Sequence, residues 1–166
     1  MSMNVSNSLS LRIYYNTYSK VVTGATRQST PTGTLSFADT SALKNAIRKL
    51  QDYNFEESSD EQTQEKIRAF ADTLNNTLQS AEKYAPNSSS VKHALSNIKN
   101  LNSQYASDLK KIGITVEKDG SVSVYESAAK NYKKSKFDDF FDKDSEYQNA
   151  LYKEAKKINR RVDVRI

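Results

Sequence analysis

Cysteine is absent from this sequence of 166 residues, and histidine occurs once, as His93. The lack of cysteine excludes disulfides, thiol catalysis and thiolate metal sites. A single histidine also excludes a zinc site built from several His or Cys ligands. We expect His93 to be an exposed helix residue, because it follows Lys92 and no nucleophile motif accompanies it. The sequence therefore predicts a protein with no enzymatic activity and no cofactor.

Glycine and long apolar runs are scarce as well. The four glycines are scattered along the chain, which excludes a glycine-rich phosphate-binding loop. No run of about 18 apolar residues occurs, so we expect no membrane span. The first residues lack the apolar stretch of an ordinary signal peptide. Hydrophobic residues make up only 36% of the chain, whereas tyrosine occurs ten times. This composition predicts a thin core in which tyrosine rings are half-buried.

The net charge of +5 is unevenly distributed along the chain. Residues 1–55 carry +4, residues 56–90 carry −4 and residues 91–166 carry +5. In the last region a group of lysines is followed at once by a group of aspartates: Lys130, Lys133, Lys134 and Lys136, then Asp138, Asp139, Asp142 and Asp144. A nucleic-acid-binding protein more often has a continuous basic face, so we expect no nucleic-acid partner. The four aspartates are more typical of a helix start and its loop than of a glycosidase carboxylate pair.

Residues 1–38 differ in character from the rest of the chain. They are rich in serine, threonine and asparagine, and they contain no acidic residue and no helical periodicity. We expect most of this segment to be mobile. Residues 39–166 are expected to form a single helical domain, whose first helix is capped by Asp39 or Thr40 and ends near Tyr53.

Two long amphipathic helices are predicted next. The first has a capping box at its start, either Ser58 with Glu61 or Ser59 with Gln62, and it cannot continue past Pro86. Apolar residues recur at helical spacing in both: Ile67, Phe70, Leu74, Leu78 and Ala81 in the first, and Val91, Leu95, Ile98, Leu101, Tyr105, Leu109 and Ile112 in the second. We expect the two helices to form an antiparallel hairpin, with the contact of their apolar stripes as the main source of stability.

A β-hairpin is predicted over about residues 114–124. Its turn, Asp119-Gly120, lies between two short alternating apolar segments, which is the strongest short-range hairpin signal. The residues that define it are Ile112 and Gly113 at the helix end, Ile114 in the first strand, Asp119 and Gly120 in the turn, and Val122 and Val124 in the second strand. Gly113 fits the left-handed position that follows a helix.

The predicted fold class is therefore mainly α. It is an antiparallel long-helix hairpin or bundle with one small β-hairpin and short C-terminal helices. We expect these C-terminal helices near residues 127–134 and over about residues 144–160, where Tyr147, Leu151, Ala155 and Ile158 share one side.

The hairpin segment has one alternative interpretation, a calcium-binding loop. Counted from Thr115 to Glu126, Glu117 and Asp119 fall at positions that an EF-hand loop uses, and Gly120 takes the place of its glycine. The first position of such a loop requires an aspartate, however, and here it is Thr115. The alternation of valines with polar residues favours two strands, so we do not expect calcium as a ligand.

The order of these elements resembles the flagellar cap protein family, also called hook-associated protein 2. The resemblance rests on a helix that ends in Leu-x-x-Ile-Gly-Ile, a hairpin with glycine in its turn, a short helix and an aromatic segment. The matching residues are Leu109, Ile112, Gly113, Ile114, Gly120, Val122, Val124 and the segment 137–141, and the helix segment 67–76 is also similar. The resemblance covers about residues 60–142. It concerns only the family's helical core, because the β-rich outer domains and terminal coiled coils have no counterpart here.

The resemblance implies a non-enzymatic structural or interaction protein, exported as an extracellular component of a bacterial flagellum. Residues 1–38 would then direct export. Its partners would be flagellar proteins or further copies of itself. The candidate contact residues are Tyr84, Tyr105, Phe137, Phe140 and Phe141, for which core packing is the alternative. The alternative function is a cytoplasmic protein-binding or regulatory module that has kept only the fold.

Overall fold

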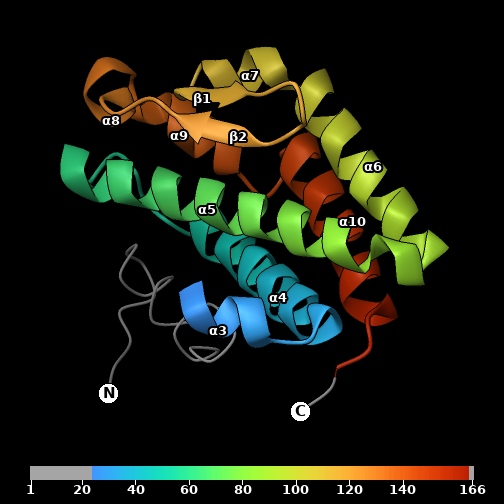
Figure 1. Ribbon diagram of the computed structural model, residues 1–166. Coiled ribbons are helices and arrows are strands. Elements are labelled where there is room, and N and C mark those ends of the chain that lie inside the picture. Colours follow the sequence, from blue (N-terminus) through green and yellow to red (C-terminus); the bar gives the residue numbers. More distant parts are fainter. Residues whose placement is uncertain (1–23, 165–166) are drawn as a thin grey trace.

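The computed structural model describes residues 24–164, and helices dominate this part of the chain (Figure 1). The long helices are α4 (Thr32–Gln51), α5 (Asp60–Tyr84), α6 (Ser89–Gln104) and α10 (Glu146–Arg161). The shorter elements are α3 (Gly24–Ser29), the 3-10 turn η1 (Ala85–Asn87), α7 (Ala106–Lys110), β1 (Ile114–Val116), β2 (Val122–Val124), α8 (Ala128–Asn131) and α9 (Lys134–Phe141). The predicted fold class, mainly α with one small β-hairpin, is confirmed.

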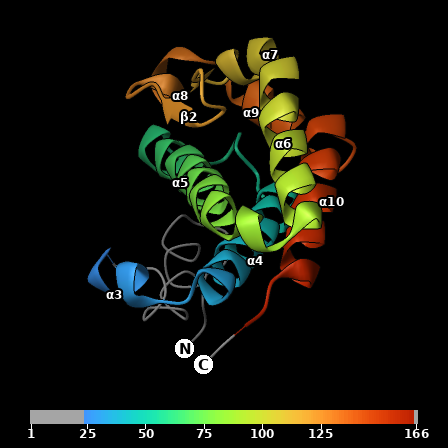
Figure 2. The ribbon, with the colours of Figure 1, turned by 45° about the vertical axis from the view of Figure 1, so that its right-hand side comes forward.

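The four long helices form a bundle in which α5 packs most extensively on α4, and α10 packs on both α4 and α6 (Figure 2). The contact between α5 and α6 is smaller. The sequence prediction was therefore wrong on one point: α5 and α6 do follow each other through a short turn, but their mutual contact is not the main packing. The apolar stripe of α5 is instead covered chiefly by α4, the helix that precedes it.

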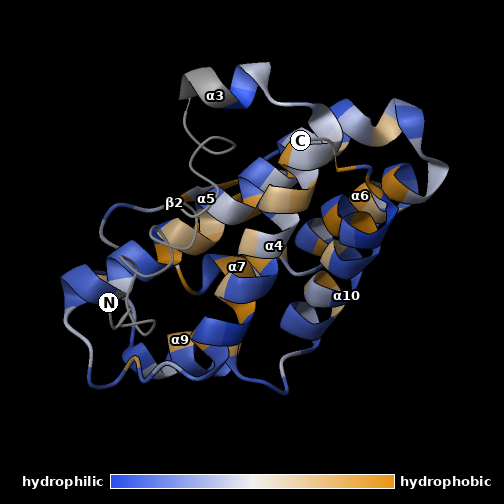
Figure 3. Cartoon of the chain, turned by 90° about the horizontal axis from the view of Figure 1, so that it is seen from below, coloured by the Kyte–Doolittle hydropathy of each residue, from blue (hydrophilic) through white to orange (hydrophobic). Residues whose placement is uncertain are grey.

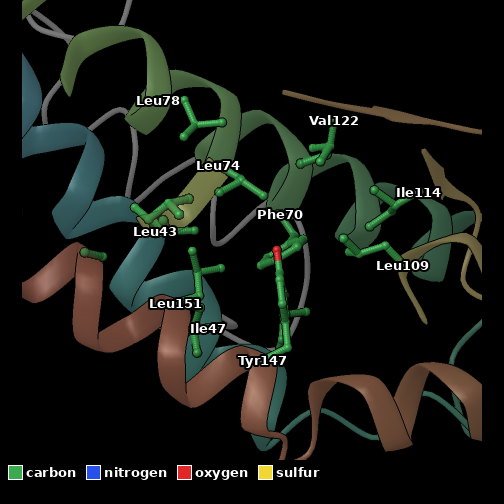
Figure 4. Close-up of a cluster of buried hydrophobic side chains, with 14 of the residues drawn as sticks. Leu43, Ile47, Phe70, Leu74, Leu78, Leu109, Ile114, Val122, Tyr147 and Leu151 are labelled. Carbon is green, nitrogen blue, oxygen red and sulfur yellow. The ribbon is translucent and has the colours of Figure 1, made fainter. Parts of the chain in front are cut away.

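One hydrophobic core joins the bundle to the hairpin (Figure 4). Leu43 and Ile47 of α4, Phe70 and Leu74 of α5, and Leu151 of α10 are all at most 1% exposed. The same cluster includes residues from the short elements and the turn after α7, namely Leu109, Ile112, Ile114, Val122, Phe137, Phe140 and Phe141. Each large apolar side chain buried in this way contributes about 1.5–3 kcal/mol before the entropy of ordering is subtracted. The outward sides of α9 and α10 are largely hydrophilic (Figure 3).

The first long helix begins earlier than the sequence predicted. Helix α4 begins at Thr32, so neither Asp39 nor Thr40 is a cap. Asp39 lies inside the helix, fully buried, and its carboxylate accepts two 2.8 Å hydrogen bonds from the guanidinium of Arg27 in α3. Residues 24–38 thus contribute to the helical fold, although the predicted mobile segment included them. The rest of that segment, residues 1–23, lies outside the described residues.

The cap of α5 was predicted correctly in one of its two forms. Ser59 accepts a hydrogen bond from the Gln62 backbone N–H, and the Gln62 side chain accepts one from the Ser59 backbone N–H. This reciprocal pair is a capping box, which satisfies two backbone donors at the helix start.

The predicted third helix is divided at Tyr105. The apolar stripe predicted one helix as far as Ile112, whereas α6 ends at Gln104 and α7 begins at Ala106. Backbone hydrogen bonds continue through the bend, from Tyr105 N–H to Leu101 and from Leu109 N–H to Tyr105. No proline or glycine marks this bend, so the apolar spacing alone did not show it.

The hairpin has the predicted strands. Ile114 pairs with Val124 and Val116 with Val122 in an antiparallel register. The loop has three residues, 118–120, because Glu117 donates to the Ser121 carbonyl oxygen at 2.8 Å and Gly120 donates to the Glu117 carbonyl oxygen at 3.0 Å. A turn followed by a left-handed glycine is a common three-residue hairpin connection. None of the described helices has the length and apolar character needed to cross a membrane.

Candidate functional site

Four of the five aromatic candidates are buried in the folded chain, and only Tyr105 is half-buried. Phe137 and Phe141 are 0% and 1% exposed, and their rings pack around Phe55. Tyr84 is 8% exposed, and its hydroxyl accepts a 3.1 Å hydrogen bond from the Asp163 backbone N–H. In this fold Phe137, Phe141 and Tyr84 act in packing and offer little surface to a partner.

The remaining two candidates, Tyr105 and Phe140, meet at one pocket of about 310 Å³. We call it the aromatic pocket. It lies between α7, α9 and the start of α10, and it is lined by Tyr105, Asp108, Lys111, Ile112, Lys136, Asp139, Phe140, Ser145, Glu146 and Tyr147. The bend at Tyr105 places α7 beside the start of α10, so the division of the predicted helix creates the pocket.

Three aromatic rings form its apolar part. The centroid of the Tyr147 ring lies 5.5 Å from that of Tyr105 and 5.2 Å from that of Phe140. These separations are typical of favourable aromatic contacts. Ile112, which is buried, also lines the pocket.

The rim of the pocket carries charges of both signs. Tyr105 donates its hydroxyl to Glu146 at 3.2 Å, and Lys111 forms an ion pair with Asp108 at 2.8 Å. Local desolvation, followed by the hydrogen bond to Glu146 and the negative charges of Glu146 and Asp108, raises the pKa of Tyr105. The phenol is therefore neutral at physiological pH and keeps its proton in the bond to Glu146. A mixed rim of this kind is typical of protein–protein contacts, where polar groups surround an apolar centre.

A buried hydrogen-bond chain connects the pocket to the hairpin. The Tyr147 hydroxyl donates to Oδ1 of Asn102 at 2.8 Å, and Nδ2 of Asn102 donates to the carbonyl oxygen of Gly120 at 2.9 Å. Complete burial raises the pKa of Tyr147, which keeps its hydroxyl protonated as the donor. Tyr147, which forms one wall of the pocket, is thus linked to the hairpin turn through Asn102.

Two amides of α5 hold the rest of the hairpin segment. Asn75 accepts from the Val122 N–H at 2.9 Å and donates to the Val122 carbonyl oxygen at 2.8 Å, so that it takes the place of a neighbouring strand. The Gln64 side chain likewise donates to the Tyr125 carbonyl oxygen and accepts from the Ala129 N–H. Asparagine and glutamine spaced 11 residues apart share one helix face, but the sequence did not identify them, because amides in a helix usually face solvent.

The two hairpin glycines are both required by the backbone. Gly113 has φ of +81° and Gly120 has φ of +87°. At Gly113 a Cβ atom would overlap the Cβ of Ala128, and at Gly120 it would lie 2.6 Å from Cγ and 2.9 Å from Cβ of Lys99. The left-handed position predicted for Gly113 is confirmed.

Lys66 is a residue that sequence analysis missed. It is only 2% exposed, and its ammonium lies 4.2 Å from the centroid of the Tyr53 ring. Burial lowers the pKa of Lys66 to about 7, against a smaller opposing influence of Glu65. No sequence signal distinguishes Lys66 from a surface lysine, since it lies among polar residues in the first turns of α5.

The carboxylates of the hairpin segment are engaged with neighbouring side chains. Asp119 accepts hydrogen bonds from the Ser121 N–H and hydroxyl, which lower its pKa, and Glu117 accepts one from the Ser123 hydroxyl. Glu126 pairs with Arg68 of α5. The segment forms two strands, which is the conformation that its alternating valines predicted in preference to a calcium-binding loop. Within residues 24–164 no group of His, Asp or Glu side chains is arranged to hold a metal ion, and His93 is exposed on α6.

A larger hollow of about 560 Å³ lies between α5 and the start of α8. Its lining is almost entirely polar and includes Asp60, Glu61, Arg68 and Lys130. It lacks the aromatic wall that gives the aromatic pocket an apolar anchor point, so we regard the aromatic pocket as the stronger candidate.

Comparison with known proteins finds no match: no family model, no curated protein and no solved structure is significantly similar to this chain. The resemblance to the flagellar cap family therefore stays a prediction from the sequence.

Proposed function

We propose that this chain is a non-enzymatic interaction protein of the flagellar-cap type, and that it binds a partner protein through the aromatic pocket. One observation supports the binding role above all: Tyr105 and Phe140 meet at a hollow of about 310 Å³ with a charged rim. Such a hollow suits a single apolar anchor residue of a partner, and anchors of this kind carry most of the free energy of many interfaces.

The proposed family rests on the segment that runs from Leu109 to Phe141. Its helix end, glycine-containing hairpin, short helix and phenylalanine-rich helix follow one another as the resemblance requires, and they pack into one core with α5. Export as a flagellar component is the corresponding cellular role. The cytoplasmic alternative uses the same pocket with a partner inside the cell.

Export is tested by measuring secretion of the tagged chain from a flagellated bacterium and from a strain of it that lacks flagellar export. We expect the chain in the medium of the first strain only. A variant without residues 1–23 is expected to stay in the cell. Removal of residues 1–38 is a poorer test, because Leu35 and Ala38 are buried in the fold. Equal retention of the full chain in both strains would support the cytoplasmic alternative.

Pocket binding is tested separately, by co-sedimentation of the purified chain with isolated hooks and filaments. Tyr105 is half-buried, and Tyr105→Ala removes one aromatic wall of the pocket. We therefore expect this variant to bind about tenfold more weakly. Lys92→Ala, on the exposed side of α6, is the matched control and is expected to bind as the native chain does. Equal loss in both variants would contradict a role for the pocket.

A further inference from the structure

Helices α4 and α10 lie side by side with opposite directions. Near the start of α4, the Phe37 carbonyl oxygen accepts a 3.2 Å hydrogen bond from the side chain of Asn159 near the end of α10. Near the end of α4, Arg48 lies against Tyr152 in the first half of α10. Side chains from the two helices are therefore brought together along one seam, although they are about a hundred residues apart in sequence.

Four cations and one tyrosine gather along this seam, which we call the basic seam: Lys44, Arg48, Tyr152, Lys156 and Arg160. The Arg48 guanidinium lies 4.8 Å and the Lys44 ammonium 5.7 Å from the centroid of the Tyr152 ring. Burial and then the positive charges of Arg48, Lys156 and Arg160 lower the pKa of Lys44. Lys44 thus lies close enough to the other three cations to be affected by their charges.

The positive charge of the seam is not neutralised by the part of the chain that the structure describes. The ion pairs formed there involve other lysines and arginines, and none involves a cation of the basic seam. Arg48, Lys156 and Arg160 are exposed, so a partner reaches them without any change in the fold. Clustered like charges held in this way favour an anionic partner.

We propose that the basic seam binds an acidic α-helix of a partner protein. Lys44 and Arg48 are four residues apart on α4, as are Lys156 and Arg160 on α10, which is a rise of about 6 Å along each helix. A partner helix with Asp or Glu at every fourth position repeats its carboxylates at the same interval. Such a helix, lying along the seam, places its acidic row against both cationic rows.

Two other anionic partners fit the seam less well. A single-stranded nucleic acid needs aromatic rings on which its bases stack, and Tyr152, the one aromatic residue of the seam, already has Lys44 and Arg48 over its ring. An anionic membrane needs apolar side chains that enter the lipid. The large hydrophobic residues exposed in the described part of the chain are Tyr125 and Val164, and neither belongs to the seam.

The test measures the affinity of the full chain for three probes, by fluorescence anisotropy for the labelled peptide and oligonucleotide and by co-sedimentation for the vesicle. The first probe is an alanine-rich helical peptide of about 16 residues with glutamate at every fourth position. The second is an oligothymidylate, and the third is a phosphatidylcholine vesicle with roughly a third phosphatidylglycerol. We expect the peptide to bind most tightly, and its binding to weaken as salt is raised from about 0.05 to 0.3 M, because the charges are exposed.

Two variants locate the binding. The double variant Arg48→Gln/Lys156→Gln is expected to bind the peptide about tenfold more weakly. Lys156→Gln/Arg160→Gln, which leaves the contact between Arg48 and Tyr152 intact, is expected to show a similar loss. The matched control Lys92→Gln/Lys118→Gln removes the same charge from exposed positions on α6 and the hairpin, and it is expected to bind normally.

Several results would overturn the proposal. They are an equal loss in the control variant, tighter binding of the oligonucleotide or of the vesicle, and equal binding of a peptide with the same glutamates in scrambled order. Self-association that the seam variants abolish, measured by light scattering, would assign the surface to a second copy of the chain and would also overturn it. None of these results bears on the aromatic pocket, because the two surfaces share no residue.

Discussion

The hydroxyl of Tyr147 donates a 2.8 Å hydrogen bond to Oδ1 of Asn102, and both residues are almost fully buried. Asn102 in turn bonds the backbone of the hairpin turn at Gly120. A buried polar group that keeps its partner costs little, whereas one that loses its partner destabilises the fold. This pair therefore links the wall of the aromatic pocket to the element on which the family resemblance rests.

Tyr147→Phe removes this bond and leaves the Asn102 oxygen buried without its donor. We expect the free energy of unfolding to fall by about 1–3 kcal/mol in urea titrations followed by circular dichroism. Tyr152→Phe is the matched control, because no hydrogen bond of the Tyr152 hydroxyl is found within the described structure, and it is expected to change stability by less than about 0.5 kcal/mol. Equal stability of the two variants would show that the buried bond contributes nothing.

Asn75→Ala removes both hydrogen bonds to the Val122 backbone. Those N–H and C=O groups then face α5 without a partner, so we expect a loss of about 1–3 kcal/mol in the same measurement. Asn100→Ala, at an exposed position on α6, is the control and is expected to be nearly neutral. The hairpin amides should also exchange their protons faster in Asn75→Ala than in the control; unchanged exchange would mean that α5 does not hold the strand.

Lys66 makes the stability depend on pH in the neutral and mildly basic range. Its pKa is about 7 in the folded chain and 10.5 when exposed, so the unfolded chain binds more protons between these values. The penalty for a buried charge is fully present below pH 7 and is relieved as the pH rises. We expect stability to increase by about 2–3 kcal/mol from pH 6 to pH 9.

Lys66→Met tests this assignment. Methionine keeps the apolar stem against Tyr53 without the charge, so we expect the variant to be about 1–4 kcal/mol more stable at pH 6. We also expect it to lose most of the rise in stability toward pH 9. Lys92→Met, at an exposed site, should keep the rise. A pH profile that is identical in the native chain and in Lys66→Met would refute the role of Lys66.

The two hairpin glycines are expected to differ in their tolerance of substitution. Gly113→Ala meets both a left-handed backbone and the Cβ of Ala128, so we expect a loss of about 2–4 kcal/mol or failure to fold. Gly120→Asn introduces a residue that tolerates this backbone better, but its Cβ would lie 2.6 Å from Cγ and 2.9 Å from Cβ of Lys99, so we expect a smaller loss of about 1–2 kcal/mol. Thermal unfolding of the two purified variants compares them directly, and the opposite order would contradict the packing at Ala128.

Local signals in the sequence predicted local structure well. The box of Ser59 with Gln62 and the turn at Asp119-Gly120 each act over a few residues, and both are observed. The start of α4 was missed because polar residues before Asp39 suggested a mobile segment, although Pro31, just before the first helical residue, was an available signal. The bend at Tyr105 keeps its backbone hydrogen bonds and depends on packing against Tyr147, which no local pattern encodes.

The candidate sites likewise depend on contacts between distant parts of the chain, which local patterns do not predict. Tyr105 and Phe140 were identified from the sequence as candidate contact residues, but their meeting at one pocket depends on α7 and α9 folding against α10. The basic seam was missed entirely, because its two halves are about a hundred residues apart and each half has ordinary composition for a surface helix. A basic face within one helix would show in the sequence, whereas the basic seam combines residues from two helices.

The hairpin is too short to be stable alone, since a two-stranded sheet with strands of three residues is at best marginal in water. It is held by Asn75, Gln64 and Asn102, which come from helices formed by earlier parts of the chain. We therefore expect the strands to have no stable folded state that is separate from the bundle, and to form after α5 and α6 are in place. In a folding experiment the hairpin would report the last step of assembly, and in the native protein its opening would be an early sign of global unfolding.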